Sequence, residues 1–273
     1  MDNQGACATR AFSCSGAKVL HSILILGGTT EARQIAGRLA ALHRFRLELS
    51  LAGRTKTPVE QPVPVRTGGF GGADGLAHYL AHQRIDLMID ATHPYAAQIS
   101  ANAATAARMA DIPLVALRRP GWDRVPGDRW QEVESVEQAV ANLGDAPRLV
   151  FLALGRQELL PFEAAPRHHY LVRSVDPVEP PLALADVRYI TARGPFALDE
   201  EVALLRDNGI EVIVSKNSGG TASYGKIAAA RALGLDVIMI RRPALPDVCS
   251  FQTVEALVDH VAQAFPADQL RGE

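Results

Sequence analysis

The sequence contains few cysteines: among its 273 residues only Cys7, Cys14 and Cys249 occur. Their spacing matches no metal site, and three scattered cysteines do not build a disulfide framework. We therefore expect unpaired thiols, as in the reducing cytoplasm, and no bound metal. No sequence element suggests a flavin or a haem either.

A surplus of positive charge is also missing. Lys and Arg number 28 against 30 Asp and Glu, so the formal net charge is -2. A nucleic-acid-binding protein that relies on counterion release needs a basic surplus, so this class is not expected. The balance still allows a local basic patch for a small anionic ligand.

Long hydrophobic runs are absent as well, and no segment approaches the length of a membrane-spanning helix. Residues 1–18 are rich in Ser, Ala and Gly and lack the apolar centre of a signal peptide. We expect these residues to form a mobile extension outside the folded part. Hydrophobic residues make up 48% and charged residues 21%, which is ordinary for a soluble globular protein of one large or two modest domains.

From residue 23 onward, strand-like and helix-like patterns alternate, which predicts parallel sheets with right-handed crossovers. Short apolar runs predict strands at 23–26, 47–52, 63–65, 87–89, 114–117, 149–154, 170–172, 187–191, 212–214 and 237–240. Apolar residues at helical spacing fall between them and near the C-terminus. The stretch 118–122 is a plausible junction. We predict two α/β domains, 19–118 and 119–273, with a cleft between them.

The first glycine-rich turn joins a predicted strand to a predicted helix. Gly27, Gly28, Thr29, Thr30 and Glu31 occupy it, in the context of a dinucleotide-binding fingerprint. Free N–H groups at the start of a helix favour a phosphate. Thr29 stands where the fingerprint has its second glycine, so an ordinary strand–helix turn capped by a threonine is the alternative.

The residue type after the second strand bears on which dinucleotide is bound. NAD enzymes carry an acidic residue about 20 residues past the fingerprint, where it binds the ribose. This chain instead has Gly53, Arg54, Thr55 and Lys56 there. A guanidinium can bind a 2′-phosphate with two hydrogen bonds. We therefore predict NADPH, with a solvated arginine as the alternative.

Two further loops are expected at the same edge of the first sheet. Thr92, His93, Pro94 and Tyr95 follow the strand predicted to lie beside the first one, at the point where strand order reverses and ligands bind. A glycine cluster that includes Gly68 and Gly69 should end the third strand there. We expect these residues to contact the cofactor, although His93 could also be purely structural.

A second polar, glycine-rich loop follows a strongly apolar strand at residues 212–214. Lys216, Asn217, Ser218, Gly219 and Gly220 concentrate ammonium, amide, hydroxyl and backbone N–H groups there, which suits carboxylate binding. Residues 220–226 also match the start of a phosphate-binding P-loop. The next residue is Ile227 rather than Ser or Thr, so we interpret that match as chance.

Six segments of the chain resemble the precorrin-6A reductase family of cobalamin biosynthesis, in family order. They are residues 25–32 (ILGGTTEA), 90–96 (DATHPYA), 119–122 (RPGW), 192–196 (ARGPF), 215–220 (SKNSGG) and 226–231 (KIAAAR). The resemblance covers nearly everything from residue 23 onward, whereas the stretch before residue 19 departs from the family. As a set these segments are specific, although none is so alone.

The resemblance implies two Rossmann-like three-layer domains that hold NADPH and a tetrapyrrole. It implies reduction of precorrin-6A to precorrin-6B, with hydride added at C19 and a proton at C18. No nucleic-acid or membrane partner is expected, and we favour a cytoplasmic monomer because one chain would enclose its own site. The alternatives are an NADPH reductase of a smaller substrate and a dinucleotide-binding sensor without turnover.

The tetrapyrrole that the resemblance implies carries many carboxylates, so cationic and N–H-rich residues are the candidates to bind it. Lys216 is the candidate closest to the chemistry, because its ammonium could hold the substrate, order its loop and stabilise developing charge. The proton could come from water or from Tyr224. The substrate-binding candidates are Arg118, Arg119, Arg193, Lys216, Asn217, Ser218, Gly219, Gly220, Tyr224 and Lys226.

Overall fold

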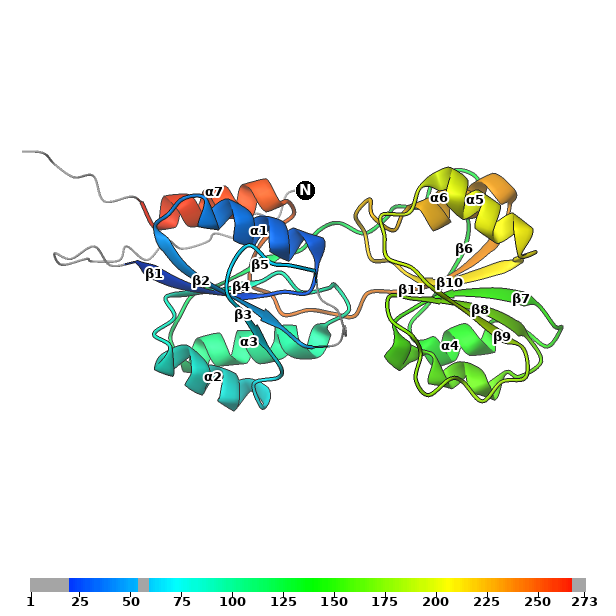
Figure 1. Ribbon diagram of the computed structural model, residues 1–273, viewed down its shortest axis with the longest axis horizontal. Coiled ribbons are helices and arrows are strands. Elements are labelled where there is room, and N and C mark those ends of the chain that lie inside the picture. The colour runs from blue at the N-terminus through cyan, green and yellow to red at the C-terminus, as the bar shows by residue number, and fades with distance from the viewer. Residues whose placement is uncertain (1–19, 54–58, 267–273) are drawn as a thin grey trace, which may run out of the picture. The chain divides into compact units, whose positions relative to one another are not determined.

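The computed structural model describes residues 20–53 and 59–266. The chain forms two compact units, both drawn in Figure 1. Among the described residues, those up to Arg119 and those from Ala244 onward form the first unit, and Pro120–Pro243 form the second.

The first unit is built on a six-stranded sheet in the order β12-β5-β4-β1-β2-β3, in which every neighbouring pair is parallel. Strand order reverses between β1 and β4, as in dinucleotide-binding folds. The strands are β1 (His21–Leu26), β2 (Phe45–Leu51), β3 (Val65–Thr67), β4 (Leu87–Asp90), β5 (Leu114–Leu117) and β12 (Cys249–Phe251).

Helices cover both faces of this sheet, which gives three layers (Figure 1). One face packs on α1 (Thr30–Ala40) and α7 (Val254–Ala264), and the other packs on α2 (Gly72–His82) and α3 (Ala97–Met109). Successive residues of β1 alternate between the two hydrophobic cores. This explains the continuous apolar run of that strand, because both of its faces are buried.

The second unit contains another all-parallel sheet, in the order β6-β11-β10-β7-β8-β9. Figure 1 shows α5 (Leu198–Asp207) and α6 (Gly225–Leu233) on one face and α4 (Val136–Ala141) on the other. The strands are β6 (Arg129–Val133), β7 (Leu149–Ala153), β8 (His169–Ser174), β9 (Val187–Thr191), β10 (Val212–Lys216) and β11 (Asp236–Ile240). Two 3₁₀ turns, η1 (Arg156–Glu158) and η2 (Leu160–Ala164), follow β7.

Alternating α/β architecture on parallel sheets is confirmed, with three differences from the sequence-based expectation. The strands β6 and β12 were not predicted. The C-terminal segment does not belong to the second unit as expected, because β12 pairs with β5 and α7 packs on α1 in the first. Cys249 is disulfide-bonded, contrary to the expectation of unpaired thiols.

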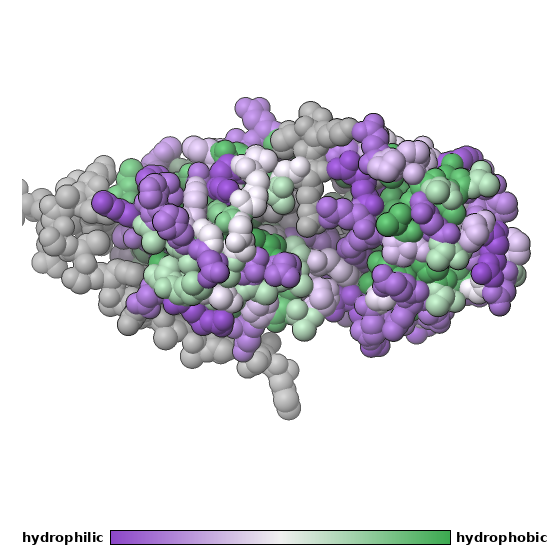
Figure 2. Space-filling model, turned by 90° about the horizontal axis from the view of Figure 1, so that it is seen from below, coloured by the Kyte–Doolittle hydropathy of each residue, from purple (hydrophilic) through white to green (hydrophobic). Residues whose placement is uncertain are grey.

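Figure 2 shows hydrophilic and hydrophobic residues interspersed over the visible face of the molecule. Large exposed hydrophobic side chains include Leu160 at 66% and Met109 at 56% of their full exposure. Within residues 20–53 and 59–266, no helix has the length and apolar character needed to cross a membrane. The same residues contain no group of three or more His, Cys, Asp or Glu that could hold a metal ion.

Candidate active site

The first candidate region is the first rim, which we define as the residues following the carboxyl ends of β1, β2, β3, β4 and β5. The turn after β1 needs glycine at both of its first positions. A Cβ on Gly27 would lie 2.6 Å from Leu49 Cδ1, so a side chain there would collide with β2. Gly28 has φ +111° and open space where a Cβ would point. The turn is therefore close to the sheet on one side and open on the other.

Thr29 fixes the start of α1 through its side chain. Its Oγ1 accepts the Ala32 amide at 3.1 Å and donates to the Ala91 carbonyl at 2.8 Å. This N-cap joins α1 to the segment after β4. The amides of Thr30 and Glu31 lie in the first turn of α1, where an α-helix offers no internal acceptor. Such amides, together with the helix dipole, favour an anionic group.

Two of the predicted binding residues form an ion pair at this rim. Arg119 Nη1 lies 2.7 Å from Glu31 Oε1, and both side chains are largely buried. Arg118, which is also a substrate-binding candidate, belongs to the first unit and contacts Asp90. Both arginines therefore stabilise the first rim in this structure.

Asp90 is the fully buried last residue of β4 and organises the segment after it. Its Oδ1 accepts the Thr92 hydroxyl at 2.6 Å and the Thr92 amide at 3.1 Å. Its Oδ2 accepts the Ser100 hydroxyl at 2.6 Å and Arg118 Nη2 at 2.7 Å. Burial alone would raise the pKa of Asp90, but Arg118 and the two hydroxyls outweigh it and hold that pKa below its usual range.

The remaining part of that segment is compact. The Tyr95 amide donates to His93 Nδ1 at 3.3 Å, and the two rings lie 5.7 Å apart. Pro94, between them in the chain, is buried. The three residues follow Thr92 directly, so the Asp90 hydrogen bonds help to place them on the first rim.

The glycine cluster after β3 is held by Arg66, a residue that belongs to no motif recognised in the sequence. Its guanidinium donates to the carbonyls of Gly68 and Gly69 at 3.0 and 3.2 Å and stacks 3.8 Å from the Phe70 ring centroid. No atom lies within 4 Å of where a Cβ on Gly68 or Gly69 would point. These glycines therefore leave open space on the first rim, with β2 between their strand and β1.

The predicted 2′-phosphate residues follow β2. Gly53 has φ +72°, and a Cβ there would lie 2.9 Å from Thr67 Cγ2, which explains the glycine at this position. Arg54 and Thr55 lie outside the described residues.

The second candidate region is the second rim, which we define as the last residues of β7 and β10 and the residues that follow them. Strand order in the second sheet reverses between these two strands. Lys216 ends β10, and its ammonium forms an ion pair with Glu158 of η1, which follows β7. The side chains of Lys216 and Glu158 are 15% and 27% exposed, so the pair is partly shielded from water. Lys216 was predicted from the sequence, whereas Glu158 lies in no recognised motif and was not.

Asn217 stabilises the loop after β10 rather than pointing a free amide outward. Its Oδ1 accepts the Trp122 amide at 2.7 Å, and its Nδ2 donates to the Trp122 carbonyl at 2.9 Å. The Trp122 indole in turn donates to the Gly220 carbonyl at 2.8 Å. A Cβ on Gly219 would lie 2.1 Å from the Pro120 carbonyl oxygen, so only glycine fits there. These contacts hold the loop after β10 against residues 120–122.

Lys226, the predicted substrate-binding residue on α6, is buried with only 3% exposure. Its Nζ donates to the Ser223 carbonyl at 2.8 Å and lies 4.9 Å from the Trp122 ring centroid. Burial lowers the pKa of Lys226 to about 7, with Arg173 also lowering it and Glu201 opposing. Its amine is therefore held in the interior between the Ser223 carbonyl and the Trp122 ring.

The other predicted substrate-binding residues lie around the same loop. The Tyr224 hydroxyl accepts Arg231 Nη2 at 2.6 Å, and its ring lies 5.7 Å from that of Trp122. Ser218 is half-buried in the loop. Arg193 is exposed after β9, whose place in the sheet is separated from β10 by β7 and β8.

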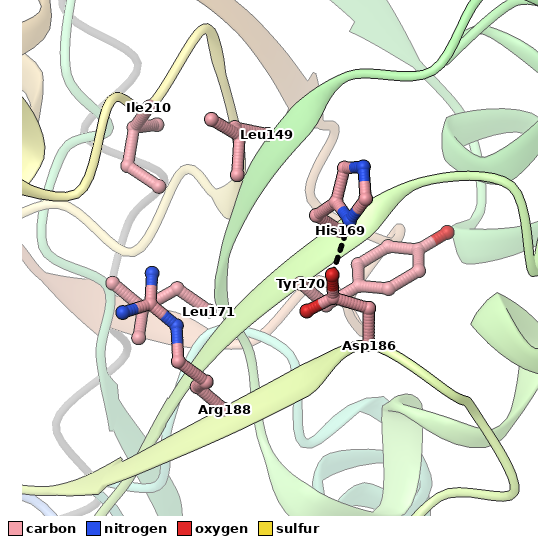
Figure 3. Close-up of a pocket in the computed structure, with 7 residues that line it drawn as sticks. All are labelled: Leu149, His169, Tyr170, Leu171, Asp186, Arg188 and Ile210. Atoms are coloured by element: carbon pink, nitrogen blue, oxygen red, sulfur yellow. Dashed lines mark hydrogen bonds and ion pairs between the residues drawn. The ribbon is translucent and has the colours of Figure 1, made fainter.

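The second unit also has cavities at the opposite, amino ends of its strands. One of about 340 Å³ opens beside the first residues of β7 and β8 (Figure 3). The figure shows His169 paired with Asp186 and the Arg188 side chain across the cavity from them. A cavity of about 370 Å³ adjoins Arg129 and Asp236, the first residues of β6 and β11. Neither cavity includes a residue of the second rim.

Known proteins are similar to this chain in sequence and in fold. The model of the family "Precorrin-6x reductase CbiJ/CobK" matches residues 22–262. Precorrin-6A reductase from Sinorhizobium sp is 58% identical over 240 residues, 88% of this chain and 92% of its own. The Rhodobacter capsulatus precorrin-6A reductase is 49% identical over 88% of this chain and 95% of its own. The solved structure of CobK precorrin-6A reductase superposes with a TM-score of 0.85 at 48% identity, covering 89% of this chain and 97% of that one. The chain belongs to the precorrin-6x reductase CbiJ/CobK family.

Proposed function

We propose that this protein reduces precorrin-6A to precorrin-6B with NADPH, adding hydride at C19 and a proton at C18 of the macrocycle. The observation that carries the proposal is the 58% identity to a precorrin-6A reductase over 92% of that protein. Sequence similarity at this level and coverage makes a shared reaction the expected outcome. The two rims offer residues suited to the two ligands.

The first rim suits the dinucleotide. The turn at Gly28 and the loop at Gly68 and Gly69 are open on the ligand side, and the α1 amides suit a pyrophosphate. When bound, NADPH would supply the hydride. Arg54 is the candidate for its 2′-phosphate, because a guanidinium binds phosphate bidentately and no acidic residue follows β2 before Glu60.

The second rim suits a polyanionic ring. Lys216 supplies a charge, Ser218 a hydroxyl, and Gly219 and Gly220 backbone amides. We propose that this rim binds substrate carboxylates and that Lys216 lies near the reacting carbon. Buried polar contacts of this kind orient a substrate and stabilise charge that develops during reaction.

The test is spectrophotometric. Purified protein with precorrin-6A and NADPH is expected to consume NADPH and to convert the tetrapyrrole chromophore, and NADH is expected to support much slower turnover. NADPH binding without oxidation would identify a sensor instead. Turnover of small carbonyl compounds but not of precorrin-6A would identify a different reductase. Size-exclusion chromatography of the same sample tests our proposal that the enzyme is a monomer.

A further inference from the structure

Glu158 is the carboxylate that faces the candidate lysine at the second rim. It lies in η1, immediately after β7, and β7 pairs with β10 through Ala153 and Ser215. Only Leu154 and Gly155 separate η1 from β7, so a short connection places Glu158 beside the carboxyl end of β10. A side chain on a short turn next to a strand keeps its geometry better than one on a long mobile segment.

Both oxygens of the Glu158 carboxylate are engaged. Oε1 receives the Lys216 ammonium, and Oε2 accepts the Gly155 amide at 3.1 Å. The backbone hydrogen bond fixes the plane of the carboxylate, and the carboxylate in turn limits where the lysine nitrogen can lie. Without such a partner, a long lysine side chain must give up much of its rotamer freedom each time its nitrogen is held at one position.

We infer that Glu158 is a positioning residue of this reductase, which holds the Lys216 ammonium in place at the second rim and acts on turnover only through it. This inference rests on the proposed function. The effect should appear in turnover more than in cofactor binding, because the pair lies in the second unit whereas the fingerprint turn lies in the first. Losing the order of one lysine should slow turnover about tenfold.

The test compares Glu158→Gln, Lys216→Met and the double variant in single-turnover reactions with enzyme in excess, so that slow rates are measurable. Glu158→Gln is expected to slow reduction of precorrin-6A about tenfold with an unchanged NADPH Kd. In the Lys216→Met background the same change should have almost no further effect. Equal effects in both backgrounds, or no effect in either, would overturn the inference.

Glu163→Gln is the matched control, because Glu163 lies in η2 and its Oε1 accepts the Ala183 amide without a lysine partner in that contact. It should leave turnover unchanged. Glu158→Asp keeps the charge and should recover at least half of the rate lost in Glu158→Gln, which covers the case in which the glutamine variant folds poorly. A wild-type protein that does not reduce precorrin-6A would count against the proposed function, whereas a wild-type rate shared by Glu158→Gln counts only against this inference.

A second measurement needs no substrate. Acylation of Lys216 by an amine-reactive ester, followed by peptide mass spectrometry, should be faster in Glu158→Gln than in the wild type or in Glu163→Gln. Equal labelling in all three proteins would show that the ion pair does not hold the lysine, and would likewise overturn the inference.

Discussion

Arg118 Nη2 lies 2.7 Å from the Oδ2 of Asp90, a carboxylate with no exposed surface. The pair joins the carboxyl ends of two neighbouring strands, β4 and β5. The Arg118 amide also donates to the Phe251 carbonyl at 2.7 Å, which extends the connection to β12. This relationship connects segments of the first sheet that are far apart in the sequence.

Asp90→Asn should destabilise the protein by about 1–3 kcal/mol, because an amide cannot serve as acceptor to all its present donors and leaves Arg118 without a charged partner. Urea unfolding followed by circular dichroism measures this. Asp145→Asn is the control, because Asp145 pairs with Arg167 at the surface and its side chain is 99% exposed. It should change stability by less than about 1 kcal/mol.

The same carboxylate predicts a pH dependence. The pKa of Asp90 is lower in the folded protein than its usual value of 3.8. A lowered pKa means that the unfolded chain binds the proton more readily, so the stabilisation is complete above pH 3.8 and is lost as pH falls through the folded pKa. Asp90→Asn should remove this part of the acid-induced loss of stability. An identical slope of stability against pH in both proteins below about pH 4 would contradict the assignment.

Gly28→Ala should lower the affinity for NADPH. The loss of folding stability that the substitution causes should not account for this lower affinity. Gly28 has φ +111°, and a Cβ there would have no neighbour within 4 Å, so the new methyl would be strained and would occupy ligand space. Gly144→Ala is a matched control, because Gly144 has φ +81° and is equally open but precedes β7 in the second unit. Both variants should lose about 1–2 kcal/mol in stability. Calorimetric titration should show weaker NADPH binding in Gly28→Ala alone.

Much of the fold follows from local patterns, because strands buried on both faces are continuous apolar runs. Two strands, β6 and β12, are exceptions. β6 has only Trp130 and Val133 buried, at the edge of its sheet, so its pattern resembles a polar loop. β12 is three residues long, and its membership in the first sheet depends on pairing with β5. No local sequence pattern indicates a pairing between strands so far apart in the chain. The placement of the C-terminal segment in the first unit was therefore not predictable.

In the candidate site, too, some features were predictable from local sequence and others were not. The turn at Gly27 and Gly28 was predictable, because glycine, helix start and strand end are local features. The partners of Asn217 and Lys226 were not. Both look like ligand-binding residues in sequence, yet one binds the Trp122 backbone and the other is buried against its ring. Which polar side chains face inward depends on tertiary packing.

Arg54→Ala should weaken NADPH binding much more than NADH binding, because only NADPH carries the 2′-phosphate that a guanidinium would hold. A loss of about 10-fold or more in NADPH affinity, about 1.4 kcal/mol, is expected. Fluorescence titration with both nucleotides measures the ratio. Arg167→Ala, which removes a surface arginine of the second unit, should leave it unchanged. If Arg54→Ala weakened the binding of NADPH and NADH equally, Arg54 would instead contact a phosphate that both nucleotides have.

Lys226→Met should stabilise the protein near neutral pH. Burial lowers the pKa of Lys226 from 10.5 to about 7, so holding the charged amine costs free energy in the folded state and not in the unfolded chain. The Arg173–Glu201 ion pair beside it keeps its own two-point contact without the lysine. Methionine fills a similar volume without charge, and the gain should be on the order of a few kcal/mol.

If the buried charge of Lys226 destabilises the protein, the stability gained in Lys226→Met should depend on pH. Better packing of methionine alone would give a gain that does not change with pH. Below pH 7 both folded and unfolded chains carry the charged amine, and the cost of burying it is complete. Between pH 7 and 10.5 the unfolded chain binds more protons, so wild-type stability should rise with pH relative to Lys226→Met. The advantage of the variant should therefore shrink from about pH 7 to pH 9. Arg206→Met removes an exposed charge of α5, whose side chain is 64% exposed, and should show no such trend. An advantage that is constant over this range would mean that Lys226 does not titrate with a lowered pKa.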